Sequence, residues 1–169
     1  MDKFKANPYN SSNKLILSDD IINIMKTLNI NDFKINNLSL YQTAFVHKSY
    51  CPMVDYKDFT NDNNNLPLQN TSYETMEFLG DSILSSSVSS YLYGRFYEIY
   101  GENEGFLTKI RTRIVCGENL AKLSSELNLN KYIIISKHIE DNMESPRNSI
   151  VSYEVFCNSK SSLTFLKSL

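Results

Sequence analysis

The sequence predicts an all-α fold in a single domain. In several stretches apolar residues recur at the three- and four-residue spacing of an amphipathic helix. Only residues 131–136 are short and β-branched enough to resemble a strand, and the chain contains no internal repeat. A chain of 169 residues with 41% hydrophobic and 21% charged residues is typical of a globular protein that buries one core.

The N-terminal part predicts a lead-in followed by a helix. Residues 1–17 are polar and contain an early proline, so we expect a loose lead-in. Ser18 is a favourable helix cap, and Asp19 and Asp20 place acids in the first turn, where the helix dipole favours them. Apolar residues then follow at helical spacing: Ile21, Ile22, Met25 and Leu28.

Residues 39–50 predict a second helix, because their apolar side chains keep the helical period. The composition changes at residues 51–71, which contain two prolines, a run of asparagine and aspartate, and little periodicity. We expect this segment to form a long, exposed and mobile loop.

Two long helices are predicted in the central part of the chain. Residues 72–96 form the longest periodic stretch, and either Gly94 or Gly101 marks its end. Residues 102–127 predict the second long helix, with a break near its start. The β-branched run that follows is strand-like but has no second strand to pair with. Pro146 is expected to open a final helix.

Composition and charge exclude several classes of function. The net charge is −2 and the sequence pI is about 5.7, so any nucleic acid must be held by local patches or through metal ions. No apolar run approaches the roughly 18 residues of a membrane helix, and the first residues lack the apolar stretch of a signal peptide. We therefore expect an intracellular, cytoplasmic protein. The cysteines are far apart and are expected to be reduced thiols: Cys51, Cys116 and Cys157.

Three carboxylates are predicted to share one face of the long helix. Glu74, Glu77 and Asp81 are spaced so that they lie within roughly 60° of one another around a helix axis. The three negative charges repel one another, and a bound cation that neutralised them would relieve the repulsion. Oxygen ligands without nearby histidine or cysteine favour a hard ion, Mg²⁺ or Mn²⁺, although a solvated acidic face is the alternative. Three apolar residues are expected to be buried on the opposite face: Met76, Leu79 and Ile83.

The same stretch resembles a known family. Residues 74–81, ETMEFLGD, are similar to the signature of the ribonuclease III family, approximately E-x-L-E-F-L-G-D. Residues 43–50, TAFVHKSY, resemble the family's A-hydrophobic-T-H-x-S-Y pattern, and residues 104–111, EGFLTKIR, resemble its E-G-x-L-(S/T) segment. The resemblance implies a ribonuclease III-type endonuclease domain, all-helical, over residues 18–157. It also implies a homodimer that forms around the signature helices.

The resemblance assigns roles to individual residues. Glu77 and Asp81 match the signature's two metal-ligating acids, and Glu74 and Glu104 match two further acids that line the cleavage valley. It implies hydrolysis of double-stranded RNA with Mg²⁺, for which Mn²⁺ can substitute, leaving 5′-phosphate and 3′-hydroxyl ends.

Four other polar residues are candidates for functional or structural roles. Lys109, Arg111 and Arg113 are spaced by two, so on a helix they fan out instead of forming one stripe. They are candidate RNA-phosphate contacts, and a solvated, solubilising face is the alternative. We expect His47 to be a packed, hydrogen-bonded structural residue and not a general base.

The sequence departs from the family pattern at a second acidic pair, an Asp and a Glu three residues apart on a late helix. In one register Tyr153 and Phe156 stand at the acidic positions. In the other, Glu154 takes the Asp position and Cys157 the Glu position, which makes Glu154 a candidate third metal ligand. Beyond it a polar stretch replaces the expected apolar helix, and we interpret residues 158–169 as a divergent tail without a following double-stranded-RNA-binding domain.

Two functions follow from these patterns. The leading hypothesis is a magnesium-dependent endoribonuclease that cleaves double-stranded RNA, and the intact acidic stripe favours it. The alternative is a catalytically inactive protein of the same fold, acting as a dimerising RNA-binding or assembly module. The departure at the second acidic pair favours this alternative.

Overall fold

The computed structural model describes residues 7–61 and 64–142. Within these residues all regular structure is helical and no strand is present, which confirms the predicted all-α class. The α-helices are α1 (Ser18–Thr27), α2 (Leu38–Thr43), α3 (Glu74–Leu92), α4 (Glu98–Tyr100), α5 (Glu104–Ile114), α6 (Gly117–Glu126) and α7 (Lys137–Asn142). Tighter or wider turns connect them: η1 (Lys48–Tyr50), η2 (Val54–Tyr56), the π-helical η3 (Tyr93–Tyr97) and η4 (Leu129–Tyr132).

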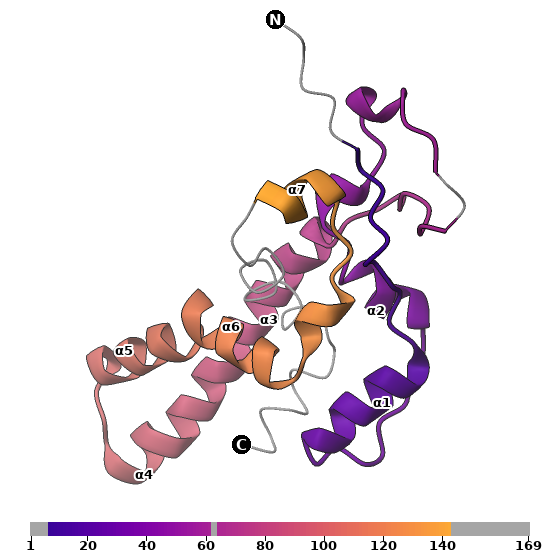
Figure 1. Ribbon diagram of the computed structural model, residues 1–169. Helices are drawn as coiled ribbons and strands as arrows, with labels where there is room; N and C mark the ends of the chain where they lie inside the picture. Colours follow the sequence, from indigo (N-terminus) through magenta and orange to yellow (C-terminus); the bar gives the residue numbers. More distant parts are fainter. Residues whose placement is uncertain (1–6, 62–63, 143–169) are drawn as a thin grey trace, which may run out of the picture.

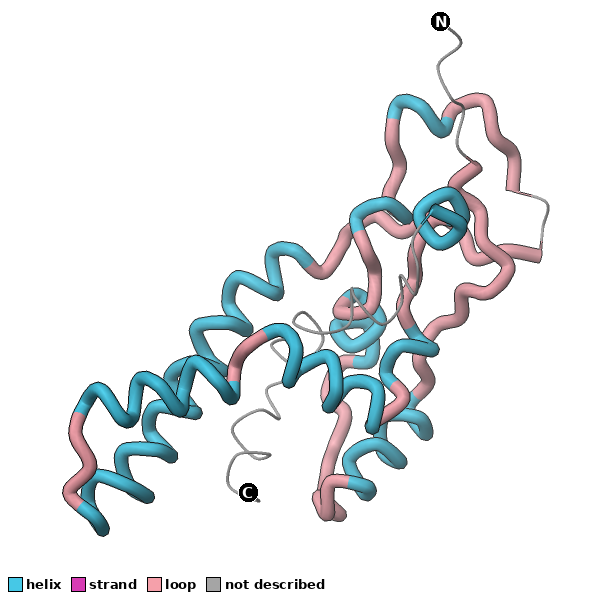
Figure 2. The backbone as a smooth tube through the Cα atoms, turned by 60° about the vertical axis from the view of Figure 1, so that its left-hand side comes forward, coloured by secondary structure: helices cyan, strands magenta, loops and turns pink. Residues whose placement is uncertain are grey.

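Helices α3, α4 and α5 form a hairpin that projects from the rest of the molecule (Figures 1 and 2). Helix α5 runs back along α3, and α6 follows it towards the body of the domain. An apolar cluster packs α3 against α6, and side chains of η3 and α5 lie against it. Its buried members are Leu84, Val88, Leu92 and Leu120. Burial of each such side chain stabilises the fold by about 1.5–3 kcal/mol.

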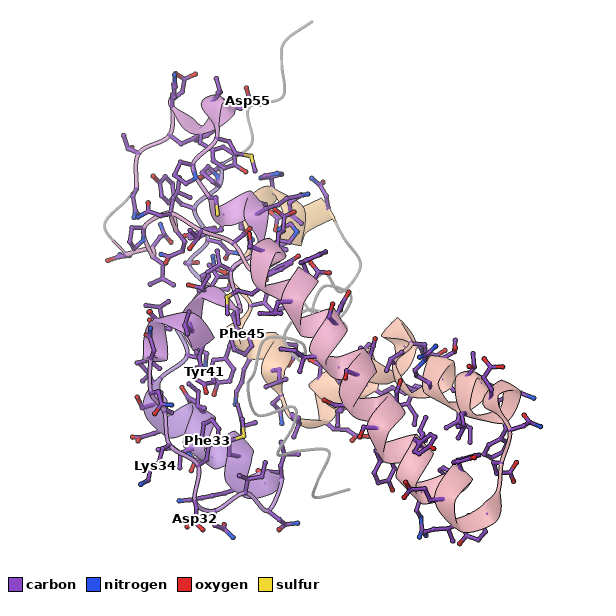
Figure 3. The ribbon with its side chains drawn as sticks, turned by 180° about the vertical axis from the view of Figure 1, so that it is seen from behind. Asp32, Phe33, Lys34, Tyr41, Phe45 and Asp55 are labelled. Atoms are coloured by element: carbon purple, nitrogen blue, oxygen red, sulfur yellow. The ribbon has the colours of Figure 1, made fainter. Side chains whose placement is uncertain are left out.

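A second apolar cluster joins α1 to the segment that follows α6. Its buried members include Ile21 and Met25 of α1 and the rings of Phe45 and Tyr132, which pack edge to face at 5.9 Å. Phe33, in the connection after α1, packs against Tyr41 of α2, with their ring centroids 6.2 Å apart (Figure 3). Helix α1 therefore buries one apolar face, as its helical spacing of apolar residues predicts.

The β-branched run is paired after all, so the prediction that it lacks a partner is wrong. Val46 and Ile134 form an isolated parallel bridge. The amide of Ile134 donates to Phe45 O, and the amide of His47 donates to Ile134 O, each over 2.9 Å. The amide of Tyr73 donates to Val46 O over 3.0 Å. Because Val46 is extended, the helix predicted over residues 39–50 ends at Thr43.

The N-terminal segment is not a loose lead-in from residue 7 onwards. Asn10 and Asn13 are buried, and the side-chain amide of each donates to Ile135 O, over 3.1 and 2.9 Å. The amide of Ile135 donates in turn to Asn13 Oδ1 over 3.1 Å. These asparagine side chains satisfy the hydrogen bonds of the buried backbone of Ile135. Amino-acid composition alone does not reveal this structural role.

Two helix boundaries differ from the predicted ones. Helix α1 begins after Leu17, whose amide donates to Asp20 Oδ2 over 3.0 Å, so Ser18 is not the cap. The predicted second long helix breaks between α5 and α6, at Val115 and Cys116, and not near its start. Gly101, with φ of +70°, ends α4 in the left-handed region that favours glycine.

Residues 51–71 are held at both ends and carry the short turn η2. The buried Tyr56 donates its hydroxyl to Ser49 O over 2.9 Å, and the Tyr50 hydroxyl donates to Leu66 O over 2.8 Å. Lys57 and several neighbours of it are exposed. The mobility of this loop stays a prediction.

The helix expected after Pro146, the candidate ligand Glu154 and the tail of residues 158–169 lie outside the described residues. None of the described helices is both long enough and apolar enough to cross a membrane.

Candidate active site

Helix α3 carries the three predicted acids in its first two turns. Glu74 begins the helix and Glu77 follows in the same turn, where negative charge interacts favourably with the helix dipole. Glu74 is exposed, whereas Glu77 and Asp81 are half-buried. The helical spacing places the carboxylates of Glu77 and Asp81 one turn apart.

Electrostatic repulsion is concentrated on Glu77. Burial raises the pKa of its carboxyl, and the negative charges of Asp81 and then Glu74 raise it further. A carboxylate in this position is destabilised by its neighbours in the absence of a cation. The arrangement therefore favours a positively charged ligand at this end of α3.

The opposite face of α3 was predicted incorrectly. Leu79 is 61% exposed and the neighbouring Phe78 is 80% exposed, whereas Met76 and Ile83 are half-buried. The buried positions of the helix are instead Gly80, Leu84, Ser87, Val88 and Leu92. The face that α3 buries is set by where α5 and α6 pack, which the local period does not specify.

Glu74 has partners that the sequence analysis missed. Lys48 Nζ lies 3.1 Å from Glu74 Oε1, and the Ser72 hydroxyl donates to Glu74 Oε2 over 3.4 Å. Lys48 belongs to the motif of residues 43–50, TAFVHKSY. That motif was the sequence feature that could have indicated a contact between Lys48 and the acidic helix. The ion pair is exposed, so it orients Glu74 more than it stabilises the fold.

Glu104 is separated from the other three acids within one copy of the chain. It begins α5, which starts beside α4 at the far end of the hairpin from the start of α3 (Figure 1). Asn103 caps α5 by accepting from the amide of Phe106 over 3.0 Å, and the Thr108 hydroxyl donates to Glu104 Oε1 over 3.1 Å. The described part of the chain contains no group of three or more histidine, cysteine, aspartate or glutamate side chains that could hold a metal ion.

The three basic candidates on α5 do not act as a set. Arg111 is half-buried and donates a hydrogen bond to Ser89 of α3. Lys109 and Arg113 are exposed and, four residues apart, share one face of the helix. Of the three candidates for phosphate contacts, Lys109 and Arg113 are the exposed ones.

His47 is half-buried and hydrogen-bonded to Ser49, as predicted for a structural histidine. Its ring packs against Tyr73, the residue before α3, at a centroid distance of 5.9 Å.

The fold and the three acids define an all-helical domain with an acidic face at the start of α3. Comparison with known protein families gives a match to the ribonuclease-III-like family over residues 37–157. The chain belongs to the ribonuclease-III-like family.

Individual relatives agree with that placement. The chain is 38% identical over 134 residues to ribonuclease 3 of Staphylococcus saprophyticus, covering 78% of this chain and 48% of that protein. It is 28% identical over 142 residues to a probable ribonuclease 3 of Acanthamoeba polyphaga mimivirus, covering 82% of this chain and 26% of that protein. The chain therefore spans about half the length, or less, of these curated relatives.

A solved structure has a similar fold. The nuclease domain of ribonuclease III from Campylobacter jejuni aligns with a TM-score of 0.61 and 25% identity, covering 88% of this chain and 91% of that one. That structure shows flexibility in the region involved in dimer formation of its nuclease domain.

Proposed function

We propose that this chain is a ribonuclease III-type endoribonuclease that hydrolyses double-stranded RNA and leaves 5′-phosphate and 3′-hydroxyl ends. The observation that carries the proposal is the pair of carboxylates on α3, Glu77 and Asp81, one turn apart and with the pKa of Glu77 raised by burial and by its acidic neighbours. Membership of the ribonuclease-III-like family supports the same activity.

The residues present fit a divalent ion. Mg²⁺ takes few protein carboxylates and keeps several waters, so the two oxygen donors of Glu77 and Asp81 are a sufficient anchor, and Glu154 is a candidate third ligand. When bound, the ion supplies Lewis-acid activation of water and of the scissile phosphate. Manganese, which accepts the same oxygen ligands, would substitute.

The chain's own residues would position the substrate. Glu77 and Asp81 would hold the cation, and Glu74, oriented by Lys48, lines the same acidic face. Lys109 and Arg113 are the exposed cations that would contact RNA phosphates. Such contacts read the shape and backbone of the duplex and not its sequence, which suits a double-stranded substrate.

A homodimer would complete the site. Two copies related by a twofold axis across α3 place their α3 helices antiparallel, so the far end of one hairpin approaches the acidic end of the other. Glu104 of the second copy would then lie near Glu74, which explains how an acid at the far end of the hairpin can line the same valley. The exposed side chains of Phe78 and Leu79 supply apolar surface for such a contact.

A second candidate function rests on the late acidic pair. In one register Tyr153 and Phe156 stand where the family has acids, and in the other only Glu154 remains, so the pair is incomplete in both. A catalytically inactive dimerising module that binds RNA is therefore the alternative.

A cleavage assay separates the two functions. Long duplex RNA is incubated with Mg²⁺ and either the wild-type chain, Asp81→Asn or the matched control Glu118→Gln, an exposed acid on α6. We expect cleavage by the wild type and the control, and its loss in Asp81→Asn. Binding of the duplex by all three proteins without cleavage by any would establish the alternative.

A further inference from the structure

His47 accepts hydrogen bonds at the start of η1. The amide of Ser49 donates to His47 Nδ1 over 3.2 Å, and Ser49 Oγ lies 2.8 Å from the same nitrogen. His47 is thus the cap of a single helical turn, and Ser49 is the residue that the cap orients.

Ser49 connects three segments of the chain. Its hydroxyl oxygen accepts from the amide of Ser136 over 3.1 Å, and its carbonyl accepts from the hydroxyl of Tyr56 over 2.9 Å. Ser49 is buried, so water cannot replace these bonds without opening the structure. Nearby, Val46 and Ile134 form a parallel β-bridge between residues 46–50 and residues 133–136, the only such bridge in the described residues.

The hydrogen-bond pattern requires a neutral imidazole. Because Ser49 Oγ accepts from Ser136, its own hydrogen is available to donate to His47 Nδ1. That nitrogen then accepts from both groups of Ser49, which places the ring proton on Nε2. A proton added at Nδ1 would face the amide of Ser49 and leave that buried donor without an acceptor.

The surroundings of His47 also favour the neutral form. Burial lowers the pKa of the ring, and the adjacent charge of Lys48 lowers it further, whereas Glu74 of α3 opposes both effects. Tyr73 packs against the ring, and the second histidine, His138 of α7, lies against Tyr56 with ring centroids 6.2 Å apart.

We propose that His47 is a pH-dependent positioning residue whose neutral ring holds together residues 46–50, residues 133–136 and the start of α3. Protonation of His47 loosens this junction, and the loosening reaches Glu74 through Tyr73 and Lys48. The consequence for Glu74 rests on the proposed function, whereas the junction itself does not.

The sign of the effect follows from linkage. Since the folded state binds the proton less readily than an unfolded chain with its ordinary value near 6.5, the contribution of His47 is fully present above that pH. It is lost as the pH falls below 6.5.

The test uses the wild-type chain, His47→Asn and His138→Asn. Asparagine at 47 retains an acceptor for the Ser49 amide but does not titrate. The chain has two histidines, so nuclear magnetic resonance can follow both ring signals separately. The same method measures the hydrogen-exchange protection of the Ser49 and Ser136 amides. We expect His47 to titrate below pH 6.5, and protection to fall several-fold from pH 7 to 5.5 in the wild type and in His138→Asn.

In His47→Asn the protection is expected to be independent of pH over the same range. Protection that stays constant in the wild type, or falls equally in His47→Asn, would overturn the proposal. If His47→Asn does not fold, the wild type alone decides, because protection must then fall between pH 6.5 and the lower pH at which the His47 signal titrates. The readout does not involve RNA cleavage, so it fails or succeeds separately from the proposed activity.

Discussion

The Arg111 guanidinium donates a hydrogen bond to the Ser89 hydroxyl over 3.2 Å, which ties α5 to α3. Arg111 therefore contributes to the hairpin, whereas its neighbours Lys109 and Arg113 face solvent. A basic segment that looks uniform in the sequence is divided by the fold into one structural residue and two available cations.

The two exposed cations predict salt-dependent RNA binding. Replacing both Lys109 and Arg113 with alanine should weaken duplex binding and lower the slope of log affinity against log salt by about one for each lost phosphate contact. Arg111→Ala should leave that slope unchanged and instead lower the free energy of unfolding by about 1 kcal/mol. Fluorescence anisotropy over a salt series measures the slope. An unchanged slope in the double variant would exclude these residues from the RNA contact.

The exposed apolar surface of α3 predicts dimerisation. Leu79→Asp should convert the dimer to a monomer, because an aspartate at the contact would be buried without a partner. Leu79 is a better site for this test than the buried Gly80, where a large side chain would also disturb the fold. Sedimentation velocity measures the mass, with Leu40→Asp on α2, also half exposed, as control. A dimer that persists in Leu79→Asp would place the interface elsewhere.

The acidic pair on α3 predicts stabilisation by divalent ions. Mg²⁺ at ten times its Kd should add about 1.4 kcal/mol to the free energy of unfolding and raise Tm by a few degrees. The rise should vanish in Asp81→Asn and persist in Glu118→Gln, whose carboxylate pairs with Lys122 on the surface of α6. Differential scanning fluorimetry measures it. Equal rises in the wild type and Asp81→Asn would mean that this face is only a solvated acidic surface.

The raised pKa of Glu77 predicts a specific pH dependence. A carboxyl whose pKa is higher in the folded state destabilises the fold when ionised, so its cost disappears as the pH falls through that value towards 4.5. Without metal at pH 7, Glu77→Gln should therefore stabilise the chain by about a few tenths of a kcal/mol for each like-charged neighbour relieved. Urea unfolding at pH 7 and pH 5 measures this.

The control for that measurement is Glu126→Gln, at the exposed end of α6. Because Glu126 lies away from the acids of α3, its replacement should not reproduce the stabilisation that we expect of Glu77→Gln at pH 7. A Glu77→Gln variant that is less stable than the wild type at pH 7 would show that a partner stabilises this carboxylate.

The loop of residues 51–71 predicts an early proteolytic site. Trypsin should cut first after Lys57, which is exposed between the anchored ends of the loop. Arg95, although exposed, lies in the helical η3 and should be cut later. Mass spectrometry of the first fragments identifies the site. Initial cleavage after Arg95 would show that the end of the hairpin opens more readily than the loop.

The sequence alone determined the features that depend on neighbouring residues along one helix. The spacing of Glu74, Glu77 and Asp81 specifies a shared face wherever α3 lies, because the helical period is a local property. The apolar periods likewise predicted α1 and α3, and the motifs within residues 43–111 identified the family before any contact was known.

The tertiary structure decided the rest, because those features depend on residues far apart in the chain. Long-range contacts include the parallel bridge between Val46 and Ile134. They also include the hydrogen bonds from the side chains of Asn10 and Asn13 to Ile135 O, and the hydrogen bond from Arg111 to Ser89. A local period says that α3 has an apolar face but not which part of it another helix covers. Tertiary packing leaves Leu79 exposed. It also places Glu104 at the end of the hairpin far from the acids Glu74, Glu77 and Asp81 of α3.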